Sequence, residues 1–237
     1  MSKKLLVIGA HSADFLWRAG GTIALVTSQG GSATVLALSY GERGESGELW
    51  KEPDQTEENV KQIRHEQAAT AAGILGADFR CLDLGDYPLT INEAAMEGLI
   101  EVFRELEPDV VLTHTPIDPF NPDHPVASQA VQKARLLSSG AGVASAFKRI
   151  TPPDLYFFEP HQPELCDFKP NTFVDITPVF EQKRKAMEGI QAQSYLQSYY
   201  TELASRRGNH ARRISGKQEV TYAEAMQRML PLVVQSL

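Results

Sequence analysis

The chain contains 237 residues, carries a formal net charge of −7, and is 42% hydrophobic and 22% charged. This composition is typical of an ordinary globular protein with a sizeable core. The length allows one large α/β domain or two small ones, and we favour a single domain over residues 1–237. Because nucleic-acid surfaces are normally basic, the acidic balance argues against nucleic acid as a partner.

Two features of the sequence bear on its compartment. There are two cysteines, Cys81 and Cys166, a number that is typical of a reducing environment and gives no disulfide framework. The apolar run at residues 5–8 is too short for a signal-peptide core or a membrane span. We therefore expect a cytoplasmic protein without a membrane partner.

Short apolar runs alternate with segments of helical periodicity along most of the chain. Asp54 with Glu57, and Thr221 with Glu224, match the capping-box pattern that begins a helix. In chain order, the predicted elements are a strand at 4–8, a helix at 14–29, a strand at 33–38, a helix at 54–75, a strand at 79–84, a helix at 92–106, a strand at 109–113, a helix at 125–137, strands at 155–158 and 172–176, a helix at 177–200 and a last helix from 221.

This order predicts an α/β protein with a Rossmann-like, mostly parallel sheet flanked by helices. Sheets of this kind bind their ligands in the loops at the carboxyl ends of the strands. The segment 39–53, after the second predicted strand, is polar, glycine-rich and long for a connection. These properties favour a functional loop.

His11 and Asp14 directly follow the first predicted strand, three residues apart at a turn into a helix. Imidazole nitrogen and carboxylate oxygen are ordinary zinc ligands, and this spacing can aim both side chains at one point. The alternative is that Asp14 caps the helix and His11 is a turn residue. The segment lacks Gly-x-Gly-x-x-Gly, so a dinucleotide is not expected there.

His124 follows the fourth predicted strand, just before a predicted helix, and is the candidate third ligand. Asp123 is placed to orient His124 from behind, although both residues would also fit a proline-rich turn with Asp123 as the N-cap. Three protein ligands with one open position are the arrangement of a catalytic zinc. The sequence therefore predicts a Zn²⁺ ion bound by His11, Asp14 and His124.

The Gly-Ala-His-x-x-Asp opening at 9–14, the Gly-Glu-x-Gly-Glu loop at 41–45 and the Asp-His pair before a helix resemble the PIG-L/LmbE-like zinc deacetylase superfamily. The resemblance extends from Leu5 to about Gln193. It implies the LmbE-like version of the Rossmann-like fold, and zinc bound at the three positions named above. Members of the superfamily commonly form homo-oligomers, so a homo-oligomer is expected here.

Two positions depart from the superfamily pattern. The usual opening is Ala-His-Pro-Asp-Asp-Glu, whose first Asp is the general base of the deacetylases, and this sequence has Ala13 there. A methyl group cannot accept a proton. The first His of the usual second motif, His-Pro-Asp-His, stabilises the oxyanion in deacetylases and is Asn121 here. We therefore expect a reaction other than amide hydrolysis.

Longer motifs are similar to the hydratase branch of the superfamily, the 4-oxalomesaconate hydratases. They are Ala-His-Ser-Ala-Asp-Phe at 10–15, Gly-Glu-Arg-Gly-Glu-Ser at 41–46 with Leu-Trp-Lys at 49–51, and Phe-Glu-Pro-His-Gln-Pro-Glu at 158–164. The resemblance implies addition of water to the C=C bond of 4-oxalomesaconate (the keto form of 4-carboxy-2-hydroxymuconate), giving 4-carboxy-4-hydroxy-2-oxoadipate in bacterial gallate and protocatechuate breakdown. The expected partner is thus a small-molecule tricarboxylate.

Such a hydration needs a base for water and a proton for carbon, while zinc can polarise the substrate. Glu45, in the long loop after the second strand, is the first catalytic candidate. His161, at the end of a predicted strand, is the second, because an imidazole titrates near neutral pH. For each, the alternative is an ordinary solvated loop side chain. Which of the two acts on water is left open.

A tricarboxylate substrate also needs cations for binding. Arg43 is the best placed, because it shares the loop of Glu45 and a guanidinium can grip a carboxylate with two hydrogen bonds. Lys51 and Arg18 are weaker candidates, and Asn121 is expected to contact the substrate. For any single one of these cations, a solvated surface charge is the alternative.

Two other interpretations stay open. A zinc deacetylase acting on an N-acetyl sugar or amide would use Glu45 or Asp118 in place of the lost base. A non-catalytic binding module would also explain that loss, and would be insensitive to Glu45→Gln and His161→Ala.

Overall fold

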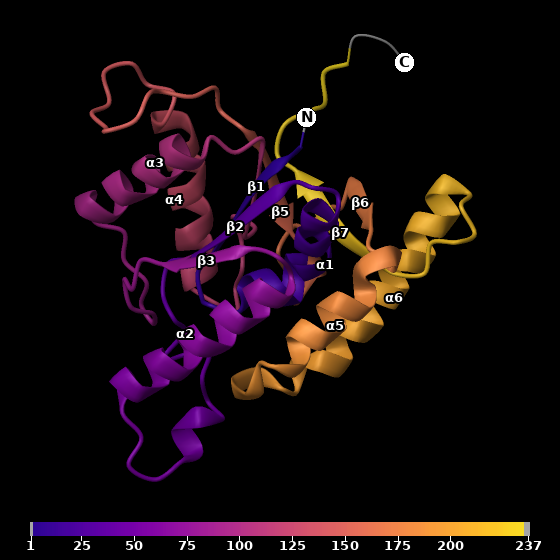
Figure 1. The fold of residues 1–237 in the computed structure, drawn as a ribbon, viewed down its shortest axis with the longest axis horizontal. Helices are drawn as coiled ribbons and strands as arrows, with labels where there is room; N and C mark the ends of the chain where they lie inside the picture. The colour runs from indigo at the N-terminus through magenta and orange to yellow at the C-terminus, as the bar shows by residue number, and fades with distance from the viewer. Residues whose placement is uncertain (1, 235–237) are drawn as a thin grey trace.

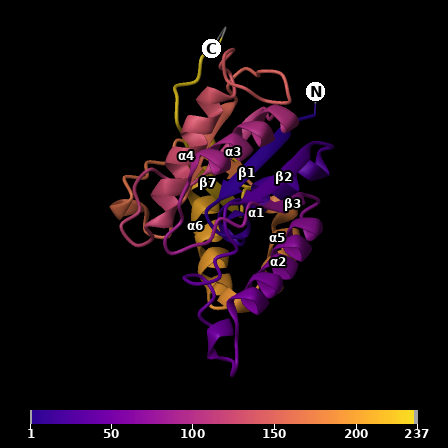
Figure 2. The same cartoon turned by 90° about the vertical axis from the view of Figure 1, so that its left-hand side faces the viewer.

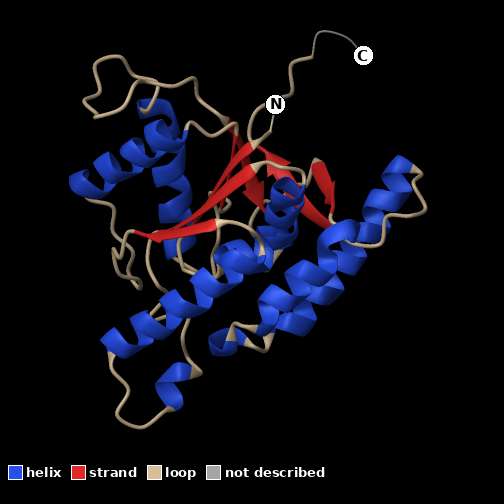
Figure 3. Ribbon diagram, in the orientation of Figure 1, coloured by secondary structure: helices blue, strands red, loops and turns tan. Residues whose placement is uncertain are grey.

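The strand β1 (Lys4–Gly9) lies near the middle of a seven-stranded sheet (Figures 1 and 3). Its apolar side chains alternate between two hydrophobic cores, one on each face of the sheet, because successive side chains of a strand point to opposite faces. It pairs in parallel with a neighbour on each side. The computed structural model describes residues 2–234 of the chain.

The sheet is parallel over five strands and antiparallel at one end. The pairs β1–β2, β1–β4, β2–β3 and β4–β5 are parallel, whereas β7 runs antiparallel to both β5 and β6. In spatial order the strands are β3 (Asp78–Cys81), β2 (Ser32–Ala37), β1, β4 (Val110–Thr113), β5 (Asp154–Phe158), β7 (Ala223–Arg228) and β6 (Thr172–Asp175). The predicted Rossmann-like α/β fold with a mostly parallel sheet is confirmed. Because β1, β2 and β4 are parallel neighbours, the loops that follow them emerge at one edge.

The helices cover both faces of the sheet (Figures 1 and 2). They are α1 (Asp14–Ser28), α2 (Glu57–Ile74), α3 (Glu93–Leu106), α4 (Asp123–Leu137), α5 (Phe180–Glu188) and α6 (Leu196–Ser215). Helices α3 and α4 pack over one core, and α1, α2, α5 and α6 pack over the other. Within residues 2–234, no helix combines the length and the apolarity that crossing a membrane requires.

The prediction of a last helix from residue 221 is wrong, because that segment forms the strand β7. Glu224 does not close a capping box. Its carboxylate accepts hydrogen bonds from the backbone N–H groups of Gly21 and Thr22 at 2.8 Å each, and lies 2.7 Å from Nζ of Lys183. The side chain that resembled a helix start therefore anchors β7 to α1 and α5.

The predicted helix at 177–200 is interrupted. The helix α5 ends at Glu188, and the chain turns before α6 begins at Leu196. Ile190 and Ala192, in this turn, are buried, so burial of their side chains in the core competes with continuation of the helix. The helix α6 then continues to Ser215, which makes the basic segment that follows residue 200 helical.

Two other helix starts differ slightly from the prediction. Thr56, and not Asp54, caps α2, because its hydroxyl accepts a hydrogen bond from the backbone N–H of Asn59. The helix α4 begins at Asp123, which places His124 in its first turn.

Candidate metal centre and active site

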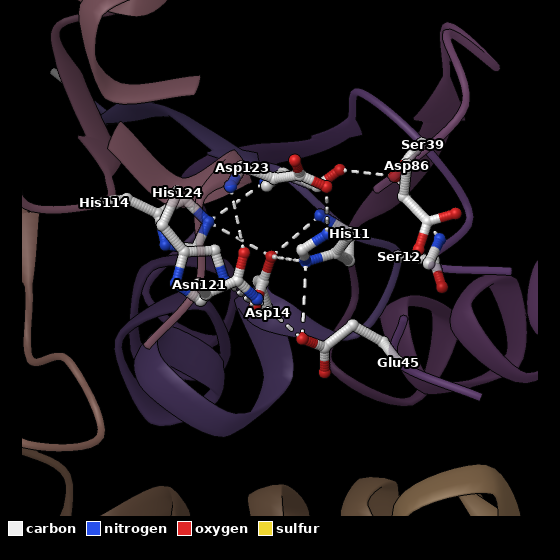
Figure 4. A network of polar contacts seen from close by, with 12 residues as sticks. His11, Ser12, Asp14, Ser39, Glu45, Asp86, His114, Asn121, Asp123 and His124 are labelled. Carbon is white, nitrogen blue, oxygen red and sulfur yellow. Dashed lines mark hydrogen bonds and ion pairs between the residues drawn. The ribbon is translucent and has the colours of Figure 1, made fainter. Parts of the chain in front are cut away.

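Three metal-ligating side chains meet at the carboxyl edge of the sheet (Figure 4). His11 follows β1, Asp14 begins α1, and His124 lies in the first turn of α4. One ligand atom from each lies within 4.8 Å of the others. Nδ1 of His11 is 3.5 Å from Oδ2 of Asp14, and Nε2 of His124 is 3.7 Å from Oδ1 of the same carboxylate. The three predicted ligands are thus brought together in one buried place.

The turn after β1 depends on Gly9. A Cβ at this position would lie 2.8 Å from Cβ of Asp14, which is closer than real Cβ atoms approach. Oδ2 of Asp14 also accepts a hydrogen bond of 2.8 Å from the backbone N–H of His11. The local sequence therefore fixes the orientation of the Asp14 carboxylate within the turn itself.

The ring nitrogens show that the donor set fits a divalent metal ion. Among the described residues, Nδ1 of His11 and Nε2 of His124 are buried without a hydrogen-bond partner, which is costly unless they bind something. The opposite nitrogens are held by carboxylates. Nε2 of His11 lies 3.3 Å from Oδ2 of Asp123, and Nδ1 of His124 lies 2.8 Å from Oδ2 of Asp118. Histidine ligands of zinc are commonly supported in this way.

The supporting carboxylates differ from the expectation that Asp123 orients His124. Asp123 contacts His11 instead, and Asp118 lies beside His124. The Asp123 carboxylate also accepts hydrogen bonds of 2.9 and 2.8 Å from backbone N–H groups in the loop 87–89. It therefore ties that loop to the first ligand.

A second set of metal-type donors, His11, Asp86 and Asp123, lies next to the first. Asp86 accepts hydrogen bonds from the backbone N–H groups of Arg43 and Gly44 at 2.9 and 2.7 Å. Both oxygens of Asp86 and of Asp123 accept backbone N–H groups, whereas only Oδ2 of Asp14 does, so this set fits a metal ion less well than the first.

The electrostatics of the first set favour a positive charge at its centre. Burial alone would lower the pKa of His11, but the neighbouring carboxylates of Asp123 and Asp14 outweigh it and raise the pKa to about 10. Burial and the neighbouring His114 lower the pKa of His124 to about 3, so its ring is neutral. Burial opposes ionisation of Asp14, but the neighbouring His114 and His11 outweigh it and hold its pKa well below 3.8. A proton or a divalent cation supplies the charge that these carboxylates favour.

Glu45 lies beside this centre, in the loop after β2. Gly41 has a φ of +71°, and a Cβ there would lie 2.9 Å from Cβ of Glu45 and 3.1 Å from Cβ of His11, so the close approach requires glycine. Oε1 of Glu45 accepts a hydrogen bond of 2.8 Å from Asn121, and Oε2 accepts one of 2.7 Å from Gln193. Oε1 is 3.9 Å from Nδ1 of His11. Two amide donors therefore hold this carboxylate toward the metal centre.

A cavity of about 250 Å³ opens in front of the centre. Its walls include the ligands Asp14 and His124 and three further predicted site residues, Glu45, Asn121 and His161. The structure thus brings both predicted catalytic side chains to the same space as the metal ligands.

His161 lies just after β5, at the exposed rim of this cavity. Its ring stacks on that of Tyr199 with 4.2 Å between the centroids, and its backbone carbonyl accepts a hydrogen bond from the Tyr199 hydroxyl. Partial burial, followed by the positive charge of Arg18, lowers the pKa of His161 below 6.5. The ring is therefore mostly neutral at pH 7.

Arg43 and Lys51 do not reach the cavity. Nε of Arg43 lies 3.1 Å from Glu57, and Nζ of Lys51 lies 2.7 Å from Glu48, with both cations substantially exposed. The predicted role of these two residues in substrate binding therefore finds no support in this arrangement. Their loop turns its carboxylate, Glu45, inward and its cations outward.

Several residues of the site carried a weak sequence signal or none. Gln193 belongs to no motif, and only its contact with Glu45 reveals it. Arg18 lines the cavity, and its spacing of four residues from Asp14 on α1 is the signal that places both on one helix face. His114, at the end of β4, stacks on His124 with 3.9 Å between the ring centroids.

Comparison with known proteins agrees with this geometry. The sequence model of the GlcNAc-PI de-N-acetylase (PIG-L) family matches residues 6–135. A 4-oxalmesaconate hydratase from Pseudomonas putida is 44% identical over 99% of this chain and 92% of its own length. A diacetylchitobiose deacetylase from Thermococcus kodakarensis is 30% identical over 81% of this chain and 70% of its own.

Among solved structures, the 4-carboxy-2-hydroxymuconate hydratase from Pseudomonas putida KT2440 superimposes with a TM-score of 0.96, at 44% identity and with 99% of each chain covered. A conserved protein from Thermus thermophilus gives a TM-score of 0.79 at 26% identity, covering 98% of this chain and 97% of its own. Since the family model spans more than half of the sequence and the hydratase relative nearly all of it, this chain belongs to the PIG-L family, as its motifs indicated.

Proposed function

We propose that this protein is a hydro-lyase that adds water to the C=C bond of 4-oxalomesaconate and yields 4-carboxy-4-hydroxy-2-oxoadipate. One observation carries the proposal: Glu45 lies 3.9 Å from His11 at the metal centre, whereas Ala13, which replaces the deacetylase base, is buried and has no proton acceptor in its side chain. The hydratase relative, 44% identical over almost the whole chain, supports it.

His11, Asp14 and His124 would hold a divalent ion, which we propose to be zinc because imidazole and carboxylate ligands suit it. When bound, the ion polarises the oxygen atoms of the substrate and offsets developing negative charge. Asp123 and Asp118 hold the two histidine rings from behind.

We assign Glu45 as the base that takes a proton from water. The oxygen of this water forms a bond to one alkene carbon, and the electron pair of the C=C bond moves toward the conjugated carbonyl oxygen. Asn121 and Gln193 donate to the two oxygens of Glu45, so the carboxylate keeps its orientation while it accepts the proton.

We assign His161 as the acid that protonates the other alkene carbon, returning the electron pair from the carbonyl oxygen and completing the addition of one water. Glu45 then releases the proton that it took from water to solvent. His161 lines the same cavity as Glu45 and is exposed at its rim, where it can regain a proton from solvent. Stacking on Tyr199 limits rotation of the ring.

The alternative, an N-acetyl deacetylase, has weaker support. Asp118, considered as a replacement base, is engaged with Nδ1 of His124 at 2.8 Å. The cavity also contains the guanidinium of Arg18, for which a neutral acetamido sugar offers no counter-charge.

We further propose that the reaction belongs to aromatic-compound catabolism in the cytoplasm. Both cysteines are free thiols, which is compatible with a reducing compartment. The homo-oligomer expected from the sequence stays a prediction.

The deciding experiment is an ultraviolet assay of 4-oxalomesaconate with the zinc-loaded full chain. We expect the absorbance of the conjugated substrate to fall, to stop falling after treatment with a chelator, and to fall again after zinc is restored. Acetate release from an N-acetylglucosaminyl substrate is measured in parallel. Acetate release without hydration would replace the proposal with the deacetylase, and neither activity in zinc-loaded protein would overturn both.

A further inference from the structure

Arg18 is the cation that the cavity presents to a ligand. Of the residues that the structure describes, it is the only arginine or lysine in the cavity wall. It lies on α1 one turn after the ligand Asp14, and its Nε is 3.6 Å from Oδ1 of that carboxylate. Only 9% of the residue is exposed.

The guanidinium is held in place but is not saturated with hydrogen bonds. Nη1 donates to the backbone carbonyl of Glu159 at 3.2 Å, and Cζ lies 5.7 Å from the ring centroid of Phe158. Nε is buried and, within residues 2–234, has no hydrogen-bond partner. Nε faces Asp14 at ion-pair distance, and no hydrogen bond among the described residues engages Nη2, so the guanidinium keeps donor capacity for an acceptor in the cavity.

The charges that line the cavity indicate which acceptor the guanidinium would bind, namely a carboxylate of the substrate. Asp14, Glu45 and Asp118 also line the cavity, so an anionic substrate meets three carboxylates. One fixed guanidinium can offset part of this repulsion, and its planar fork matches a carboxylate better than an ammonium does. Arg43 and Lys51, the other candidates, are already paired outside the cavity.

We propose that Arg18 binds one carboxylate of the substrate and thereby selects a polycarboxylate over a neutral acetamido compound. This inference rests on the proposed hydratase function and names the residue that sets its substrate class. Arg18 is a positioning and specificity residue, because it takes no part in proton transfer. A neutral ligand would leave the remaining donor of the guanidinium without an acceptor, and a site that leaves a polar group unsatisfied discriminates against such a ligand.

The test compares Arg18→Gln with Arg80→Gln in the zinc-loaded full chain. Arg80 is a matched control, because it also bears one guanidinium but pairs with Glu105 at 2.7 Å away from the cavity. Arg18→Gln should raise the KM for 4-oxalomesaconate by about 10- to 100-fold with a smaller change in kcat, the loss expected for one charge-assisted pair. Arg80→Gln should leave both constants unchanged.

Inhibition by propane-1,2,3-tricarboxylate gives a second readout that a merely structural role would not change. Wild-type protein should bind this tricarboxylate more tightly than the dicarboxylate glutarate, and Arg18→Gln should reduce the difference by about tenfold. Arg18→Lys keeps the charge but loses the fork, and should recover part of both the KM and the inhibition.

A folded Arg18→Gln protein with a KM within twofold of wild type, or with unchanged preference between the two inhibitors, would overturn the inference. If Arg18→Gln does not fold, Arg18→Met, which keeps a long side chain but removes the charge, decides in its place: a KM and an inhibitor preference equal to those of wild type would overturn it. If wild-type protein hydrates nothing, the proposed function fails by itself. Calorimetric binding of propane-1,2,3-tricarboxylate to wild type and to the variants then still tests Arg18.

Discussion

The Asn121 side chain donates a hydrogen bond of 2.8 Å from Nδ2 to Oε1 of Glu45, and so joins the loop after β4 to the loop after β2. Oδ1 of Asn121 accepts the backbone N–H of Asp123, which fixes the amide from the other side. The superfamily pattern has a histidine at this position. Asn121 instead supplies a donor that holds the Glu45 carboxylate beside the centre.

This contact predicts different effects for two variants. Glu45→Gln removes the proposed base and should lower kcat by about 10²- to 10⁴-fold, the usual contribution of general base catalysis. Asn121→Ala leaves the base in place but frees its orientation, and should cost clearly less. Steady-state kinetics on 4-oxalomesaconate checks both, with Glu48→Gln, an exposed carboxylate of the same loop, as the control. Equal kcat values for Glu45→Gln and wild type would exclude Glu45 as the base.

The parts of the fold that the sequence predicts well are those governed by local patterns. Short apolar runs predict β1, β2, β4 and β5, because parallel strands that are covered on both faces need apolar side chains throughout. The pattern is misleading at β7, where Thr221 and Glu224 match a capping box but Glu224 is buried against α1 and α5. Its partners lie 41 residues or more away in the sequence, beyond any local pattern.

The site residues divide in the same way, into those that the local sequence predicts and those that depend on distant partners. His11 and Asp14 share one turn, and the turn alone makes them neighbours. Whether a loop cation points inward is instead decided by distant partners. Arg43 pairs with Glu57 on α2 and leaves the cavity, whereas Arg18 is carried into it by the helix that also carries Asp14.

The pKa of His161 sets the expected pH dependence. The imidazolium form, which can donate a proton to carbon, exists below this pKa, and partial burial and Arg18 place it below 6.5. As the pH rises through this value, kcat/KM should therefore fall, about tenfold per pH unit above it. This fall of kcat/KM with pH should be absent in His161→Gln. It should be present in His65→Gln, which changes an exposed histidine outside the cavity. If kcat/KM instead rose as the pH passes this pKa, His161 would act as a base.

The contact between Asp118 and His124 predicts a change in metal affinity. Asp118→Ala removes the acceptor that holds the His124 ring, and loss of such a supporting carboxylate typically weakens metal binding by about 10- to 100-fold. Competition for zinc with a chromophoric chelator measures this change without reference to activity. Asp167→Ala, an exposed carboxylate paired with Lys169, is the control. Unchanged zinc affinity in Asp118→Ala would mean that Asp118 does not support metal binding through His124.

Restoring the deacetylase residue in Ala13→Asp tests whether the missing base matters to this reaction. Ala13 is 1% exposed, so the new carboxylate would lie buried next to Asp14. It adds a negative charge beside the ligand and no group that the hydration uses, so hydration should not increase. Ala13→Asn separates the charge from the size of the side chain. A higher hydration rate in Ala13→Asp, but not in Ala13→Asn, would show that water is activated from this side.

The ion pair of Lys183 with Glu224 should dominate the stability of β7, the strand that the sequence did not predict. Both side chains are almost fully buried, with 2.7 Å between Nζ and Oε1, and Nζ also donates to the backbone carbonyl of Trp17. Lys183→Met leaves the carboxylate buried without its counter-ion, and should lower the free energy of unfolding by about 3–5 kcal/mol. Arg184→Met, which removes an exposed cation from the next position, should have a much smaller effect. Urea denaturation compares the two variants. Equal midpoints would mean that the backbone N–H groups of α1 satisfy Glu224 without the lysine.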